Sequence, residues 1–116
     1  MAVKRFLANK DTTITNAYKQ NMSTRATSSN MGSSDVLEVY SIYGQASTSS
    51  SEQSRVLVNF SMTELAASRS AGKVPASGSV NWFLRIYNAE HSETLPVDYT
   101  MQINAITKSW DEGYGL

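Results

Sequence analysis

Polar and apolar residues alternate with a period of two over several stretches of this chain. The clearest is residues 97–106, where every second residue from Val97 to Ala105 is apolar and the residues between them are polar. This alternation is typical of a strand with one buried face and one solvated face. Similar stretches predict strands near 36–43, 54–60 and 79–88, with a further candidate at 12–18. The chain is therefore predicted to be all-β.

The stretch 79–88 differs from the others because apolar side chains occur on both of its faces. Trp82 and Phe83 are adjacent, so in a strand they must point in opposite directions. We expect a central strand, with one of the two side chains in the core and the other directed toward a neighbouring layer or subunit.

One segment departs from the β pattern and predicts a short helix that begins just after Ser61. Ser61 and Glu64 have the spacing of a capping box, in which each side chain satisfies a free backbone donor. Arg69 is favourable in the last turn, and Gly72 can adopt the left-handed conformation that ends a helix. Such a helix would serve as a crossover between two sheets.

Together these elements predict an antiparallel two-layer β-sandwich, jelly-roll-like, with one short crossover helix. A chain of 116 residues is long enough for one such domain, here expected to span residues 1–116. The serine-rich stretch 45–54 contains little apolar surface and is predicted to be an exposed, mobile loop.

Charge and composition exclude several classes of partner. Ten basic and ten acidic residues cancel, and no run of like charge occurs, which argues against binding to nucleic acid or to an anionic membrane. No apolar stretch has the length of a membrane span, and the N-terminal residues do not resemble a signal peptide. The absence of cysteine excludes disulfides and thiolate metal sites. The default is a protein made in the cytoplasm.

Candidate chemistry is sparse. His91, between Glu90 and Glu93, could be a metal ligand or a general base, but a polar loop is the favoured interpretation. Asp35 with Asn30 could contribute to a calcium site, although an Asx turn is favoured there. No nucleophile elbow, phosphate loop or dinucleotide motif is present, so we expect no enzyme activity, no catalytic or metal residues and no cofactor.

Aromatic residues are the remaining candidates for function. If several faced solvent together they could form a sugar-binding platform, although a strand aromatic more often belongs to a core or an interface. The candidate interface or ligand residues are Trp82, Phe83, Tyr87, Tyr99 and Trp110.

The order of short motifs along the chain resembles the DNRLRE-domain β-sandwich family, relatives of carbohydrate-binding modules found on surface proteins. The resemblance spans nearly the whole chain, although the hexapeptide that gives the family its name is replaced here by "VKRFLANKDTTI". It is carried by Asp11, by Asn30 and Gly32, by Arg55, Leu57, Val58 and Phe60, by Leu65, and by Ser109, Trp110 and Glu112. In that family further strands follow the "S-W-x-E" motif, which implies that this chain is the N-terminal part of a longer protein, or that another chain supplies the missing strands.

The chain also looks like the accessory structural proteins of tailed bacteriophages, which assemble in the host cytoplasm and need no export signal. This resemblance implies a virion structural protein that decorates the capsid or the tail and binds other virion proteins and copies of itself. The alternative is a carbohydrate-binding module of a surface or secreted protein, with a surface glycan as its ligand.

Overall fold

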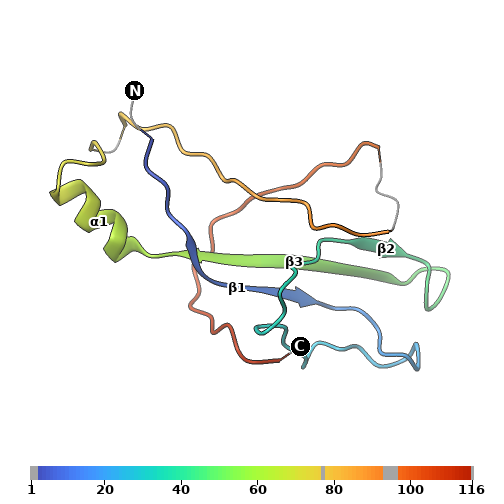
Figure 1. Ribbon diagram of the computed structural model, residues 1–116. Coiled ribbons are helices and arrows are strands. Elements are labelled where there is room, and N and C mark those ends of the chain that lie inside the picture. Colours follow the sequence, from blue (N-terminus) through green and yellow to red (C-terminus); the bar gives the residue numbers. More distant parts are fainter. Residues whose placement is uncertain (1–2, 77, 93–96, 116) are drawn as a thin grey trace. The chain divides into compact units, whose positions relative to one another are not determined.

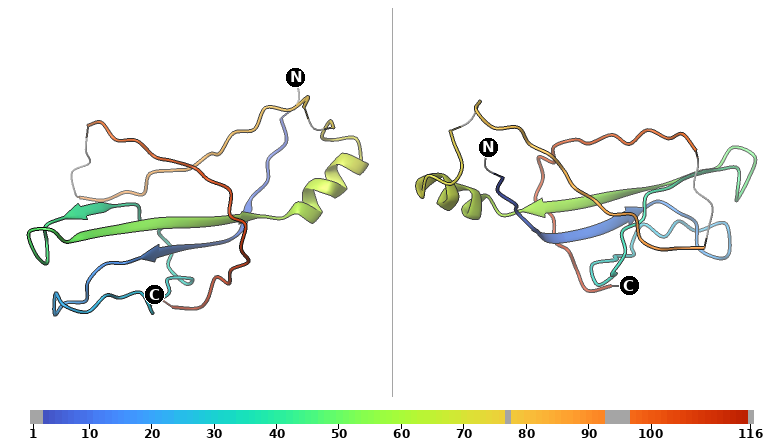
Figure 2. Two further views of the ribbon diagram at one scale, coloured as in Figure 1. Left: turned by 180° about the vertical axis from the view of Figure 1, so that it is seen from behind. Right: turned by 45° about the horizontal axis from the view of Figure 1, so that its top comes forward.

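The computed structural model describes residues 3–76, 78–92 and 97–115. It contains strands β1 (Ala8–Thr15), β2 (Ser41–Tyr43) and β3 (Ser51–Phe60), followed by helix α1 (Met62–Ser70). The strands form one antiparallel sheet in the order β1-β3-β2, so β3 is the central strand (Figures 1 and 2). The structure therefore confirms the prediction of an antiparallel, β-rich fold with one short helix.

Two compact units make up the chain. The first contains residues 1–81 with 112–116, and the second contains residues 82–111. The sheet and the helix belong to the first unit. The single sandwich domain over residues 1–116 stays a prediction.

Strand β3 is longer than predicted and is paired on both sides. It pairs with β1 from Thr15 opposite Ser54 to Ala8 opposite Phe60, with one irregularity between Ala8 and Lys10. Its first three residues pair with β2. The predicted strand at 54–60 is therefore confirmed, and it begins earlier, at Ser51.

The serine-rich stretch is only partly the open loop that composition suggested, because residues 51–54 belong to β3. The connection between β2 and β3 is organised by the buried Ser50, whose Oγ accepts hydrogen bonds from the backbone N–H groups of Ala46 and Ser47, both at 3.1 Å. The N–H of Gly44 donates to the carbonyl of Ser50 at 2.7 Å. The prediction of an exposed loop over 45–54 is thus wrong for residues 51–54, since backbone pairing overrides their polar composition.

Strand β2 is shorter than the predicted 36–43, and two side chains explain why. The Ser54 hydroxyl donates to the carbonyl of Glu38 at 2.7 Å and accepts from the N–H of Tyr40 at 2.8 Å. The N–H of Glu38 donates to Thr13 Oγ1 in β1 at 3.0 Å. The carbonyl of Tyr40 still accepts from the backbone N–H of Ser54 at 3.0 Å. Because side chains bind the other backbone groups, residues 38–40 do not form a regular strand ladder.

Helix α1 begins after Ser61 and ends before Gly72, as the sequence predicts, although of the predicted capping box only the bond to the Ser61 side chain is formed among the described residues. Ser61 is the N-cap, and its Oγ accepts from the N–H of Glu64 at 3.2 Å. At the other end Gly72 has a φ of +74°, its N–H donates to Arg69, and the N–H of Lys73 donates to Ser68. These two bonds form a Schellman motif. The described residues hold a single sheet, so the helix follows β3 without making the predicted crossover between two sheets.

The interior of the first unit is polar. Its buried residues include Thr13, Glu52 and Ser54 on the sheet, whereas Val74 is the one apolar residue buried in the described part of the chain. The two-layer sandwich needs a shared apolar core, and the single sheet seen here does not enclose one.

The C-terminal residues pack against a loop that is distant in sequence. Glu112 Oε1 accepts from the N–H of Asp11 at 2.7 Å, and the N–H of Ser33 donates to the carbonyl of Gly115 at 2.8 Å. A Cβ added at Gly32 would overlap the backbone oxygen of Glu112, so glycine is required by this close approach. The loop and the C-terminal residues therefore hold each other in place.

The predicted strands at 79–88 and 97–106 are not formed. Residues 82–92 and 97–111 contain neither helix nor strand. Between 82 and 109, the described residues make no backbone hydrogen bond to another backbone group. A strand needs a partner for its N–H and C=O groups. These two segments have the alternating sequence of strands, but no neighbouring strand pairs with them in the described part of the chain.

Candidate functional site

The second unit carries all five aromatic residues singled out from the sequence. Four are exposed: Trp82 by 57%, Phe83 by 89%, Tyr87 by 79% and Tyr99 by 65%. Trp110 is half-buried. Their exposure makes this unit the first candidate for an interaction site.

The prediction that one of Trp82 and Phe83 lies in the core and the other faces a neighbouring layer or subunit is wrong for the core. Both side chains are exposed, so neither lies in a core formed by the described residues. The expectation that one of them is buried in this chain is wrong, because the strand that would have directed it into a sheet interior does not form. Both are available to a partner.

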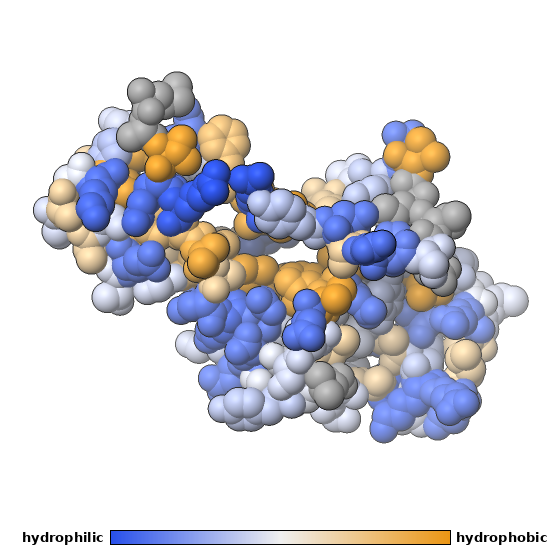
Figure 3. All heavy atoms as spheres, viewed as in Figure 1, coloured by the Kyte–Doolittle hydropathy of each residue, from blue (hydrophilic) through white to orange (hydrophobic). Residues whose placement is uncertain are grey.

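Further apolar side chains accompany the aromatic residues. We use the name exposed apolar segments for residues 82–87 and 97–106. Their other exposed side chains are Leu84, Ile86, Val97, Met101, Ile103 and Ile106. Figure 3 shows hydrophobic residues on the surface of the molecule. Clustered exposed apolar residues mark interaction surfaces in soluble proteins.

Charge contributes little to these segments. Arg85 and Asp98 are their only charged residues. The Arg85 guanidinium lies 5.2 Å from the centre of the Tyr87 ring, within the range of a cation–π contact. A partner would therefore be bound mainly by apolar contact and by backbone hydrogen bonds.

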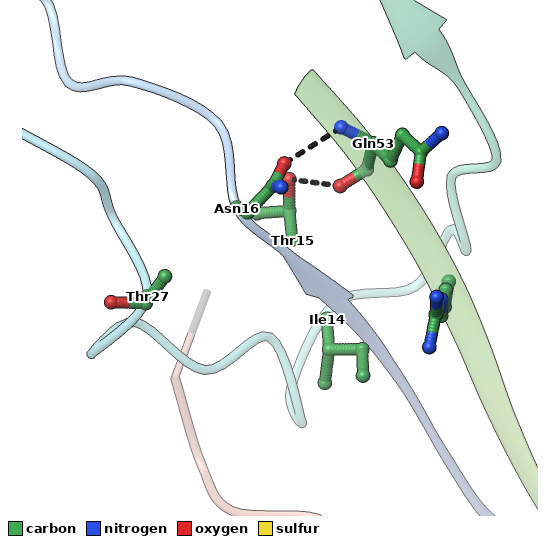
Figure 4. A pocket seen from close by; sticks show the side chains of 6 residues that line it. Ile14, Thr15, Asn16, Thr27 and Gln53 are labelled. Carbon is green, nitrogen blue, oxygen red and sulfur yellow. Dashed lines mark hydrogen bonds between the residues drawn. The ribbon is translucent and has the colours of Figure 1, made fainter. Parts of the chain in front are cut away.

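A second candidate is a shallow depression in the first unit, of about 400 Å³. It is lined by Ile14, Thr15, Asn16, Thr27, Gln53 and Arg55. Figure 4 shows the two bonds at its edge: Thr15 Oγ1 donates to the carbonyl of Gln53 at 3.0 Å, and the N–H of Gln53 donates to Asn16 Oδ1 at 2.8 Å. No sequence motif pointed to it, because its lining comes from two strands and a loop.

A buried carboxylate lies next to this region. Glu52 is 3% exposed, and its Oε1 accepts from the N–H of Tyr18 at 2.8 Å. Arg25 stacks on Tyr18, with its guanidinium 3.9 Å from the ring centre, and its Nη1 donates at 2.8 Å to the carbonyls of Asn16 and Ser51. The carboxylate and the guanidinium thus tie the chain after β1 to the start of β3, which is a structural role that sequence analysis missed.

The residues considered for metal binding are not brought together. His91 is exposed, and Glu93 lies outside the described residues. The Asn30 side chain accepts from the N–H groups of Gly32 and Gly115, as in an Asx turn extended to the C-terminal residues. In the described part of the chain no three His, Cys, Asp or Glu residues are grouped as a metal site would require.

Four positions that carried the family resemblance meet in the first unit. Asp11 is bonded to Glu112, while Asn30 and Gly32 contact the residues that follow Glu112. Their proximity gives these dispersed motifs a common structural role in fastening the C-terminal residues.

Comparison with known proteins adds no assignment. No family model, no curated protein and no solved structure matches this chain. No helix in the described ranges has the length and apolarity needed to cross a membrane.

Proposed function

We propose that this chain is a structural subunit of a bacteriophage particle, a decoration or accessory protein of the capsid or tail, and that it binds neighbouring subunits through the exposed apolar segments. The observation that carries the proposal is the placement of apolar side chains. Val74 is buried, while ten large apolar side chains of residues 82–106 are exposed among the described residues.

The energetics favour a partner over solvent. Burial contributes about 25 cal/mol for each Å² of apolar surface removed from water. A chain that leaves its strand-forming apolar residues uncovered gains this term only by association. In our proposal residues 79–88 and 97–106 become strands in contact with neighbours, and they supply the second layer of the sandwich.

The absence of an enzymatic role is part of the same proposal. The most buried carboxylate, Glu52, is engaged with the backbone of Tyr18, and the exposed His91 belongs to no group of three or more His, Cys, Asp or Glu residues in the described part of the chain. The arrangement suits assembly better than catalysis.

The assembly half of the proposal is tested by Trp82→Ser and Phe83→Ser. Each should reduce association with other subunits in light scattering at matched concentrations, while the circular dichroism of the first unit's sheet and helix is unchanged. Tyr114→Ser is the control, because Tyr114 is an exposed aromatic residue outside the segments. Association that survives both serine variants would remove the exposed apolar segments from the proposal.

The location is tested separately, by peptide mass spectrometry of purified particles from a phage that encodes the chain. Peptides of this chain at stoichiometric amounts are expected. Their absence from the particles would overturn the virion assignment.

Carbohydrate binding is the alternative, and it would use the same exposed rings. The Arg85 guanidinium lies 5.2 Å from the centre of the Tyr87 ring, so a sugar stacked on that face would compete with it. Glycan-array binding that is lost in the Trp82 and Tyr99 variants, with no change in association state, would favour this alternative.

A further inference from the structure

We propose that residues 97–105 pair antiparallel with the same residues of a second copy of this chain, about a two-fold axis at Met101. The inference rests on the proposed function and names the partner of one exposed apolar segment.

The segment has the two properties that strand pairing requires. Val97, Tyr99, Met101 and Ile103 alternate with polar residues and are all exposed. The backbone of 97–106 makes no bond to other backbone groups among the described residues. An extended segment with free N–H and C=O groups binds another strand through backbone hydrogen bonds, while alternate side chains supply the apolar contact.

The alternation restricts how two copies can align. Residues directly opposite one another in an antiparallel pair lie on the same face. Alignments centred on a residue therefore place apolar opposite apolar, whereas alignments centred between two residues place apolar opposite polar. Among the former, a centre at Met101 pairs the whole of 97–105 and sets Tyr99 opposite Ile103, an aromatic and β-branched pair of the kind that stabilises sheets.

This alignment brings no like charges together. Asp98, the one charged residue of the segment, faces Asn104 of the second copy. The two Asp98 residues are then six positions apart along the pair, about 20 Å at the rise of a strand. A second copy can therefore pair with the segment, and no separate complementary surface is needed.

Apolar contact adds to the backbone pairing. The exposed apolar side chains of the segment are Val97, Tyr99, Met101, Ile103 and Ile106. Each Å² of their surface that the second copy removes from water contributes about 25 cal/mol.

The test exploits the absence of cysteine from the chain. A single introduced cysteine can form a disulfide only between two copies. Under mild oxidation Met101→Cys should form the disulfide-linked dimer at least about tenfold faster than Tyr99→Cys or Ile103→Cys, because only residue 101 lies opposite itself within disulfide reach. Met62→Cys is the matched control, being an exposed methionine on α1.

The possible outcomes distinguish a failure of this pairing from a failure of the proposed function. A maximum at Met101→Cys, with Met62→Cys slow, supports the pairing. Oligomers in light scattering with no preference for position 101 would overturn this inference and leave the proposed function standing. A chain that is monomeric at every concentration, and that is missing from phage particles, would overturn both.

Discussion

Glu112 accepts a hydrogen bond from the backbone N–H of Asp11, a residue 101 positions earlier, at 2.7 Å. The contact joins the C-terminal residues to β1 in the first unit. Close to it, Gly32 and Asn30 contact the residues around Gly113 and Gly115. This cluster can be tested by adding a single methyl group.

Gly32→Ala should destabilise the first unit by about 1 to 3 kcal/mol, the usual cost of forcing extra atoms into a packed site. The new Cβ would overlap the backbone oxygens of Glu112 and Gly113, which are not flexible side-chain ends. Urea unfolding monitored by circular dichroism measures the change. Ser33→Ala is the control, since the Ser33 side chain is exposed; equal midpoints for the two variants would contradict the contact.

Ser54→Ala should cost about 1 to 3 kcal/mol, because its buried hydroxyl satisfies the backbone groups of Glu38 and Tyr40. Removing it leaves those groups without this partner. Thermal unfolding compares it with Ser51→Ala, a change at an exposed position of the same strand. A Ser54 variant as stable as the Ser51 variant would show that residues 38–40 are held by other contacts.

Ser61→Ala should lower the stability of α1 by about 1 kcal/mol through loss of the N-cap bond to Glu64. Helical circular dichroism during a temperature ramp is the measurement. Ser70→Ala, at the exposed last residue of the helix, serves for comparison and should have little effect. Earlier melting of the Ser70 variant than of the Ser61 variant would refute the capping role.

Arg25→Lys should destabilise the first unit by about 1 kcal/mol, since lysine cannot reproduce the planar stacking on Tyr18 together with bonds to two carbonyls. Because the substitution keeps the positive charge, the loss of stability measures the contribution of the stacking and hydrogen-bond geometry. Arg5→Lys provides the reference at an exposed residue. Hydrogen exchange at Asn16 and Gln53 should quicken in the Arg25 variant alone.

Local signals in the sequence predicted local structure well. Ser61, Glu64 and Gly72 identify the two ends of α1, because capping depends on residues a few positions apart. The alternation at 54–60 likewise identifies β3, since it contains the residues that pair with β1.

Features that depend on distant residues were not predictable in this way. The shortening of β2 arises from the hydroxyls of Ser54 and Thr13, which no pattern within 36–43 encodes. The depression near Arg55 and the buried Glu52 depend on three separate parts of the chain. The five candidate aromatic residues were found by type alone. Trp82, Phe83, Tyr87 and Tyr99 are exposed because 79–88 and 97–106 lack strand pairing, whereas Trp110 is half-buried.

The long separation between Asp11 and Glu112 also orders the events of folding. The β2–β3 hairpin closes over the short turn at residues 44–50, so its entropic cost of closure is small and it can form early. Strand β1 leaves the ribosome first and must wait for β3, a delay of several seconds at about 5 to 20 residues per second. Glu112 emerges about a hundred residues after Asp11. The bond between them can therefore close only after the sheet has been synthesised, and protection of the Asp11 amide would mark the completion of folding rather than its start.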